Sequence, residues 1–287
     1  MTTLSPNSIF RLPASEWNST LQVLNNHSVN LDHLDLLRTN NGDNESARRV
    51  GRAFVNGAFP SSTDMRIARV ALGNSLFEMA DWVRFFAARF EEDEVQKALL
   101  FPWHEDVLMS ADPWEPKKLI KDTHAAFWGV EKIGEVPLTV AQLIKMHPDE
   151  GKLRYFYPTS WHDGQPHIHV ATLAPRWHLL RIEIVPGSTG KLPGEHVKEL
   201  PAEYELPTTV AETAKAQFVF RKTGKRPNGS NWAHCAETTI KTDKCSDEYP
   251  SVVGHFDEYG LDVYGWYGYR DGLVGCGASR KTGTLNT

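Results

Sequence analysis

The sequence predicts an α+β or mixed α/β protein, and three observations support this fold class. Its composition, 40% apolar, 10% aromatic and 23% charged residues, is that of an ordinary globular protein. Apolar residues recur at helical spacing before residue 150, and short runs typical of strands follow after it. We therefore expect a mainly helical region over residues 1–150 and an α/β region over residues 151–287.

The helical region rests on apolar periodicity. Residues 1–60 carry short apolar pieces between Asn-rich stretches, which indicates helices joined by loops. The pattern over residues 63–90 predicts one long helix capped by Ser62 or Thr63. The Pro- and Trp-rich stretch 102–116 indicates a surface loop. A short helix is expected over residues 138–146.

The ends of that short helix can be placed from single residues. Thr139 stands near its start, and His147 before Pro148 ends it, because a residue that precedes proline avoids helical geometry.

The second region combines strands with one clear helix. Runs with alternation or β-branched residues predict strands over residues 153–157, 167–173, 177–185 and 261–269. A helix is expected from Thr208 or Thr209 to about Phe220, and the spacing from Thr209 to Glu212 is that of a capping box.

Charge and cysteine usage limit the classes of partner. A formal charge of −5 and a pI near 6.2 argue against a general nucleic-acid-binding surface. Without a signal-peptide pattern or an apolar stretch of membrane-spanning length, we expect a soluble cytoplasmic protein with no membrane partner. Three cysteines, all after residue 234, do not indicate a disulfide framework.

The run His234-Cys235-Ala236-Glu237 carries the clearest chemical pattern. Hydrolytic zinc sites that act on bases need a metal-bound water and a carboxylate that moves protons without binding the metal. The Cys-Ala-Glu spacing fits such a pair at the start of a helix, which we expect to begin near residue 235. Cys235 would bind zinc as a thiolate, and Glu237 would be the catalytic acid and base.

The segment 231–238 resembles the Asn-Cys-Ala-Glu-Thr-type motif of the YwqJ-like branch of the nucleotide and nucleic-acid deaminase superfamily, found in fungi and bacteria. The resemblance covers at most residues 205–287. It implies zinc as cofactor and the hydrolytic removal of an amine from a small-molecule substrate, a base, nucleoside or related heterocycle. The family's second motif, Pro-Cys-x-x-Cys, is not in the sequence, and only Cys276 stands in a comparable region.

This departure leaves several interpretations open. An irregular metal site would combine Cys235 and Cys276 with one further ligand, Cys245, His234 or His255. Alternatively the chain stops short of the missing helix, or it is a non-enzymatic accessory or interaction protein that keeps the fold without the site. The structural alternative makes Cys235 a buried small apolar residue and Glu237 a solvent-facing helix residue.

A second metal pattern is formed by His167 and His169, because alternate residues of a strand face the same side. Glu183 on the next expected strand would complete a set of two histidines and one carboxylate. The alternative is a pair of histidines on an exposed strand face. The sequence contains no Gly-x-Ser-x-Gly and no Gly-rich phosphate loop, which argues against serine hydrolases and nucleotide-binding folds.

Overall fold

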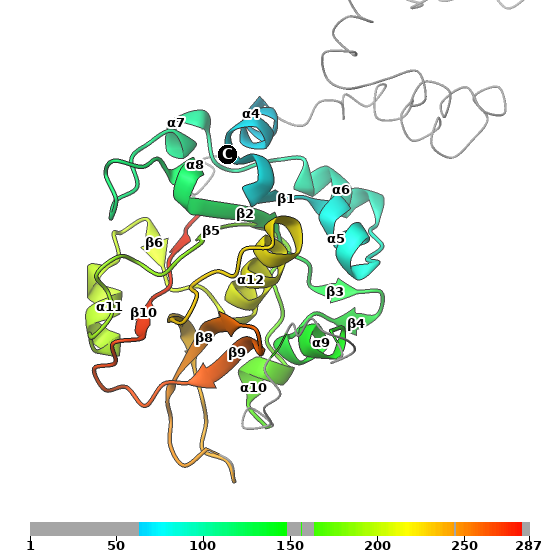
Figure 1. Ribbon diagram of the computed structural model, residues 1–287. Helices are drawn as coiled ribbons and strands as arrows, with labels where there is room; N and C mark the ends of the chain where they lie inside the picture. Colours follow the sequence, from blue (N-terminus) through cyan, green and yellow to red (C-terminus); the bar gives the residue numbers. More distant parts are fainter. Residues whose placement is uncertain (1–62, 148–155, 157–163, 244, 283–287) are drawn as a thin grey trace, which may run out of the picture. The chain divides into compact units, whose positions relative to one another are not determined.

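The computed structural model describes residues 63–147, 156, 164–243 and 245–282 (Figure 1). These described residues belong to one compact unit. The fold class is mixed α/β, with 33% helix, 24% strand and mixed sheets. The helices expected in residues 1–60 lie outside the described residues. The same holds for the strand expected over residues 153–157, apart from Phe156, which bridges to Leu261.

A five-stranded sheet brings together segments from both sides of residue 150. Its order is β1-β2-β5-β11-β6, with β1 parallel to β2 and the other pairs antiparallel. The strands are β1 Leu76–Phe77, β2 His124–Trp128, β5 Trp177–Arg181, β11 Ser279–Arg280 and β6 Tyr204–Glu205. Every residue of β2 is buried. The part expected to be mainly helical therefore contributes a strand to the core.

A four-stranded sheet is built from the last part of the chain. Its order is β10-β7-β8-β9, with β10 parallel to β7 and the other pairs antiparallel. The strands are β10 Val274–Cys276, β7 Trp232–Thr238, β8 Pro250–Asp257 and β9 Gly260–Gly265. A separate hairpin joins β3 Lys132–Ile133 to β4 Val136–Pro137.

Helix α12, Thr209–Thr223, lies at the centre of the fold and contacts strands of both larger sheets (Figure 1). All its residues from Thr209 to Phe220 are buried, so it has no solvent-facing stripe over that length. Its N-cap is Thr208, one of the two residues predicted for this role. The Thr208 hydroxyl accepts a hydrogen bond from the Ala211 amide. The predicted capping box was wrong, because Glu212 instead binds Lys215.

The remaining helices cover the sheets. They are α4 Thr63–Leu72, the 3₁₀ turn η3 Gly73–Ser75, α5 Met79–Phe86, α6 Glu92–Ala98, α7 Glu105–Leu108, α8 Ile120–Thr123, α9 Val140–Lys145, α10 Pro166–His169 and α11 Pro193–Glu199. Helix α9 confirms the prediction for residues 138–146, and its N-cap Thr139 accepts from the Gln142 amide. None of the described helices combines the length and the apolar character needed to cross a bilayer.

Two predicted elements before residue 174 were wrong. The single helix expected over residues 63–90 is divided by η3 and β1, and Gly73 there has a φ of +51°, which suits glycine. The strand expected over residues 167–173 begins instead as helix α10. Pro166 is its first residue, a position where the fixed φ of proline favours a helix.

Candidate functional site

The run from His234 to Glu237 lies on strand β7, so the helix predicted near residue 235 was wrong. Neighbouring strands account for the difference. Trp232, Ala233 and His234 pair with both β8 and β10, and a strand places alternate side chains on opposite faces. Cys235 faces the interior, where α12 lies, and His234 faces the opposite side, towards α11.

Cys235 is part of the main apolar core. Its side chain is 1% exposed, and its S–H donates to the Ala233 carbonyl at 3.4 Å. Burial raises the pKa of the Cys235 thiol well above its usual value, and the charges of Glu212 and Glu237 add to this rise. In the metal-free chain at neutral pH Cys235 is therefore a protonated thiol.

Glu237 binds the first turn of α12. Its Oε2 accepts from the Thr209 amide and from the Thr209 hydroxyl, each at 2.7 Å. The same hydroxyl lies 2.9 Å from Ser251 Oγ on β8. A carboxylate in this position satisfies an amide that has no partner within the helix, and it faces the positive end of the helix dipole. Glu237 is half-buried and is a tertiary cap of the central helix, not a solvent-facing helix residue.

His234 and Cys276 meet on the other face of the sheet. The register of β10 and β7 places them directly opposite each other. His196 from α11 approaches both: its Nδ1 is 3.2 Å from His234 Nδ1, and its carbonyl lies 3.8 Å from Cys276 Sγ. The Ser188 carbonyl, 2.9 Å from His196 Nε2, can only accept a hydrogen bond, so Nε2 carries the ring proton of the neutral His196. His196 Nδ1 is then an acceptor, and His234 Nδ1 donates to it.

Burial keeps this group uncharged. It lowers the pKa of His196, lowers the pKa of His234 to about 3 and raises the pKa of Cys276 to about 12. Trp266 also packs against both imidazole rings. His196, His234 and Cys276 are therefore neutral side chains that hold α11 against the sheet.

Two of the four predicted site residues, Cys235 and Glu237, face α12, whereas His234 and Cys276 meet on the other side of the four-stranded sheet, towards α11. The other candidate ligands have different partners. Cys245 Sγ contacts the Asp247 carbonyl at 3.2 Å. His255 stacks on Trp232, with ring centroids 4.7 Å apart. Within residues 63–147, 156, 164–243 and 245–282, no three His, Cys, Asp or Glu side chains are grouped so as to hold a metal ion.

The alternative metal pattern is also separated. His167 and His169 lie on α10, where His167 is buried and His169 is exposed, so the predicted shared strand face was wrong. Glu183 follows β5, and its Oε2 accepts from the Asn228 amide at 2.6 Å.

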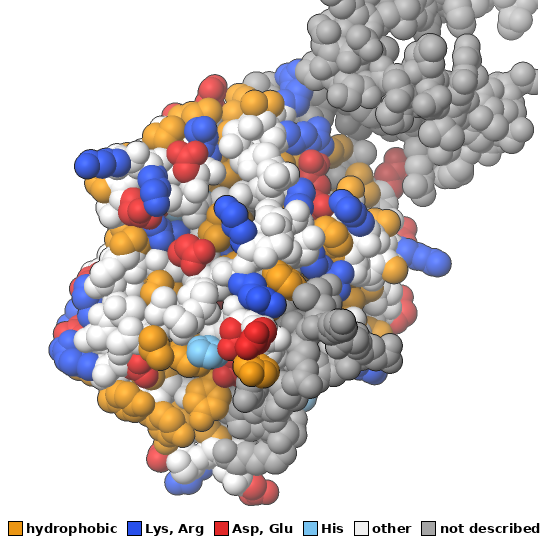
Figure 2. Space-filling view, viewed as in Figure 1, with side chains coloured by type: hydrophobic (Ala, Val, Ile, Leu, Met, Phe, Trp, Pro, Cys, Tyr) orange, Lys and Arg blue, Asp and Glu red, His pale blue; other side chains and the backbone are white. Residues whose placement is uncertain are grey.

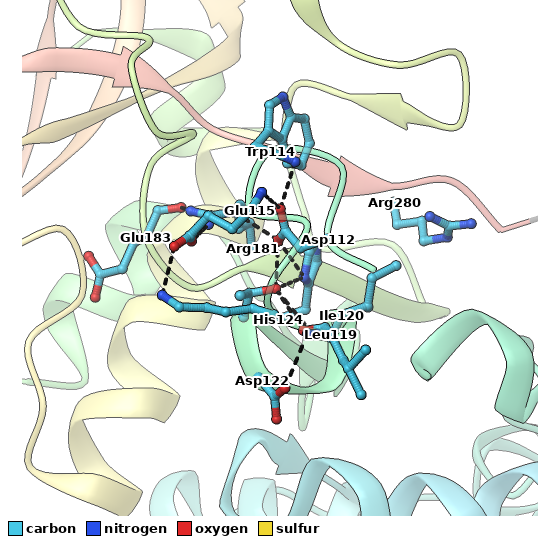
Figure 3. Close-up of polar contacts among 12 residues, drawn as sticks. Asp112, Trp114, Glu115, Leu119, Ile120, Asp122, His124, Arg181, Glu183 and Arg280 are labelled. Atoms are coloured by element: carbon cyan, nitrogen blue, oxygen red, sulfur yellow. Dashed lines mark hydrogen bonds and ion pairs between the residues drawn. The ribbon is translucent and has the colours of Figure 1, made fainter. Parts of the chain in front are cut away.

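Sequence reasoning missed a buried polar network beneath the loop before α8 (Figure 3). Asp112 is its centre. Its Oδ1 accepts from the amides of Trp114 and Glu115, and its Oδ2 accepts from Thr123 Oγ1 at 2.7 Å and Arg181 Nε at 3.2 Å. Burial alone would raise the pKa of Asp112, but these donors and the Arg181 charge lower it.

Arg181 and His124 extend this network along the five-stranded sheet. The Arg181 guanidinium also binds Glu115 and donates to the Ile184 carbonyl at 2.7 Å. His124 lies 2.8 Å from Thr123 Oγ1 and 3.2 Å from the Tyr204 hydroxyl, and burial lowers its pKa to about 3. Because these donors are directed at protein acceptors, the network is structural. Its sequence signal was Asp112 directly before Pro113, because an aspartate side chain often accepts hydrogen bonds from the backbone amides of its own turn.

A different kind of surface lies beyond the four-stranded sheet. Figure 2 shows hydrophobic side chains gathered at the lower left, over the connection between β9 and β10. Tyr267 and Tyr269 in this connection are 54% and 56% exposed. The sequence signal was the Gly- and Tyr-rich composition of residues 260–272, most of which falls in the strand expected over residues 261–269.

Comparisons of the chain with protein-family models, with curated proteins and with solved structures gave no significant match.

Proposed function

We propose that this chain is a non-enzymatic interaction protein. The observation that carries the proposal is the cap that Glu237 provides for α12: both hydrogen bonds from Thr209 end on its carboxylate. A catalytic acid and base must instead reach substrate and bound water. Cys235 supports the proposal as well, because its thiol is buried and packs in the apolar core.

The exposed tyrosines between β9 and β10 can contact a partner protein, which the buried polar clusters cannot. Tyrosine combines a large apolar ring with a hydroxyl, and it is enriched in the residues that dominate binding energy at protein interfaces. The exposed rings of Tyr267 and Tyr269 are stacked at 6.2 Å, next to strand β9. They give the interaction protein a defined contact surface.

Metal analysis of the purified full-length chain tests the proposal against the zinc-dependent deaminase. We expect no stoichiometric zinc in the parent or in the variants Cys235→Ser and His167→Ala/His169→Ala. One zinc per chain that Cys235→Ser removes, together with hydrolysis of a base or nucleoside amine, would establish the deaminase. Zinc lost only from the histidine variant would establish the alternative metal site.

A further inference from the structure

We propose that the tyrosine cluster formed by Tyr249, Tyr264, Tyr267 and Tyr269 binds a lysine- or arginine-rich segment of a partner protein, an inference that rests on the proposed interaction function. The cluster lies at the end of β9 where the chain turns towards β10.

The rings of the cluster hold one another in place. Tyr249 and Tyr267 meet edge to face with centroids 4.8 Å apart, and Tyr267 stacks on Tyr269. A hydrogen bond with Tyr267 contributes most to the rise of the Tyr264 pKa to about 12. A surface whose side chains are already ordered loses little conformational entropy on binding. The aromatic faces are also the negative poles of the ring quadrupoles, which attract ammonium and guanidinium groups.

Carboxylates surround the cluster and give it the matching charge. Tyr249 OH donates to Asp247 Oδ2 at 3.4 Å, and the exposed Glu248 precedes Tyr249 in the chain. Asp262 stands two residues before Tyr264 on β9, hence on the same face, and its charge contributes to the raised Tyr264 pKa. Residues 241–249 and 262–271, the two segments that carry the cluster, have five Asp and Glu against three Lys and Arg.

Among the residues that the structure describes, the nearby cations compensate little of this charge. Arg270, beside Tyr269, is bound to Glu195 on α11 at 2.9 Å. Lys241 reaches Asp247 only at 4.0 Å, and both side chains are mostly exposed, an arrangement that stabilises little in water. A basic partner therefore gains both cation–π and charge–charge attraction here. The phosphates of a nucleic acid, which also stacks on aromatic rings, are repelled by the same carboxylates.

Fluorescence anisotropy with a labelled oligo-arginine peptide and the full-length chain tests this inference. The test variant is Tyr267→Ala/Tyr269→Ala. Its matched control is Tyr259→Ala, at the turn between β8 and β9, where the ring is 53% exposed. A second pair compares Asp247→Asn with Glu258→Gln, which removes the same charge from that turn. An oligo-glutamate peptide and a single-stranded oligonucleotide serve as competing probes.

We expect saturable binding of oligo-arginine, with the Kd raised about tenfold or more in Tyr267→Ala/Tyr269→Ala and little changed in Tyr259→Ala. Asp247→Asn should weaken binding more than Glu258→Gln does. Equal losses in test and control variants would overturn the inference, because they indicate nonspecific attraction to an acidic protein. Preference for the oligonucleotide or oligo-glutamate would overturn the choice of partner and leave the interaction function standing, whereas zinc-dependent deamination would overturn the function itself.

Discussion

Two residues of the proposed zinc motif have structural partners on the central helix. Glu237 accepts from Thr209 at the start of α12, and Cys235 lies in the core that α12 and the sheets share. The spacing of two residues between them fits one face of a strand as well as it fits a catalytic pair. We therefore expect Cys235 and Glu237 to stabilise the fold, and mutants can test this role independently of catalysis.

Replacing Glu237 with alanine removes the tertiary cap of α12. We expect the free energy of unfolding to fall by about 1–2 kcal/mol, because the Thr209 amide loses its acceptor in a half-buried position. Urea unfolding followed by circular dichroism measures the loss. Thr238→Ala, an exposed neighbour on the same strand, is the control and should change little. A stability unchanged in Glu237→Ala would contradict the capping role.

The carboxyl group of Asp262 should make the free energy of unfolding depend on pH. Burial raises its pKa to about 6, against the partial offset by His255 and by the Trp232 indole N–H. Since the folded state holds the proton more tightly than the unfolded state, ionisation of Asp262 destabilises the fold as pH rises towards and above 6. Asp262→Asn should therefore raise the free energy of unfolding by about 1–3 kcal/mol at pH 7 and by little at pH 4. Equal effects at the two pH values would contradict this.

Helix α12 carries a buried ion pair between Lys215 and Glu212. Lys215 is 1% exposed, and its Nζ donates to the carbonyls of Arg181 and Ile182 and to Glu212. Asn228 Nδ2 also donates to Glu212 at 3.2 Å. These contacts connect the helix to the end of β5 and to the loop before β7, so the ion pair fixes how the sheets meet the helix.

Breaking that ion pair should cost more than removing it. Lys215→Met leaves the Glu212 carboxylate buried without its cation, and we expect a loss of about 3–5 kcal/mol in the free energy of unfolding. The double variant Glu212→Leu/Lys215→Met should be less destabilised than Lys215→Met alone. Chemical unfolding of both variants checks this, and a single variant as stable as the parent would show that the pair contributes nothing.

Features that depend on neighbouring residues could be predicted from the sequence, whereas features that depend on distant segments could not. Thr139 and Thr208 mark helix starts by local chemistry, and both caps form. The strand at Cys235 depends on pairing with β8 and β10, which come later in the chain, so local spacing alone favoured a helix. Similarly, Asp112 and Arg181 are separated by 69 positions, and their contact follows from the arrangement of the sheet and not from either neighbourhood.

At the scale of the whole molecule, buried neutral histidines predict sensitivity to acid. Burial lowers the pKa of His124 and His234 to about 3 and of His147 and His178 to about 4. Histidines of the unfolded chain titrate near pH 6.5. Each unit by which the folded pKa lies below that value corresponds to about 1.4 kcal/mol in the free energy of unfolding. Their contribution is complete above that pH and is lost as pH falls towards the folded pKa values. Burial also lowers the pKa of His196, so Asp262, which acts in the opposite direction, is one group against five.

Urea unfolding at pH 7, 6 and 5 should therefore show a falling free energy of unfolding. The variant His178→Gln retains a donor for the Ala174 carbonyl, which lies 3.0 Å from His178 Nε2. It should show a smaller fall between pH 7 and pH 5 than the parent. The matched control His169→Gln, at an exposed position, should follow the parent. A stability independent of pH over this range would contradict the burial of uncharged histidines.

We expect the His234 to Glu237 run to stabilise the fold equally with and without zinc. The measurement is the free energy of unfolding of the chain in a chelator and again in excess zinc, because a metal bound only by the folded state stabilises that state. We predict the same value under both conditions. A higher value in zinc that Cys235→Ser abolishes would contradict the claim.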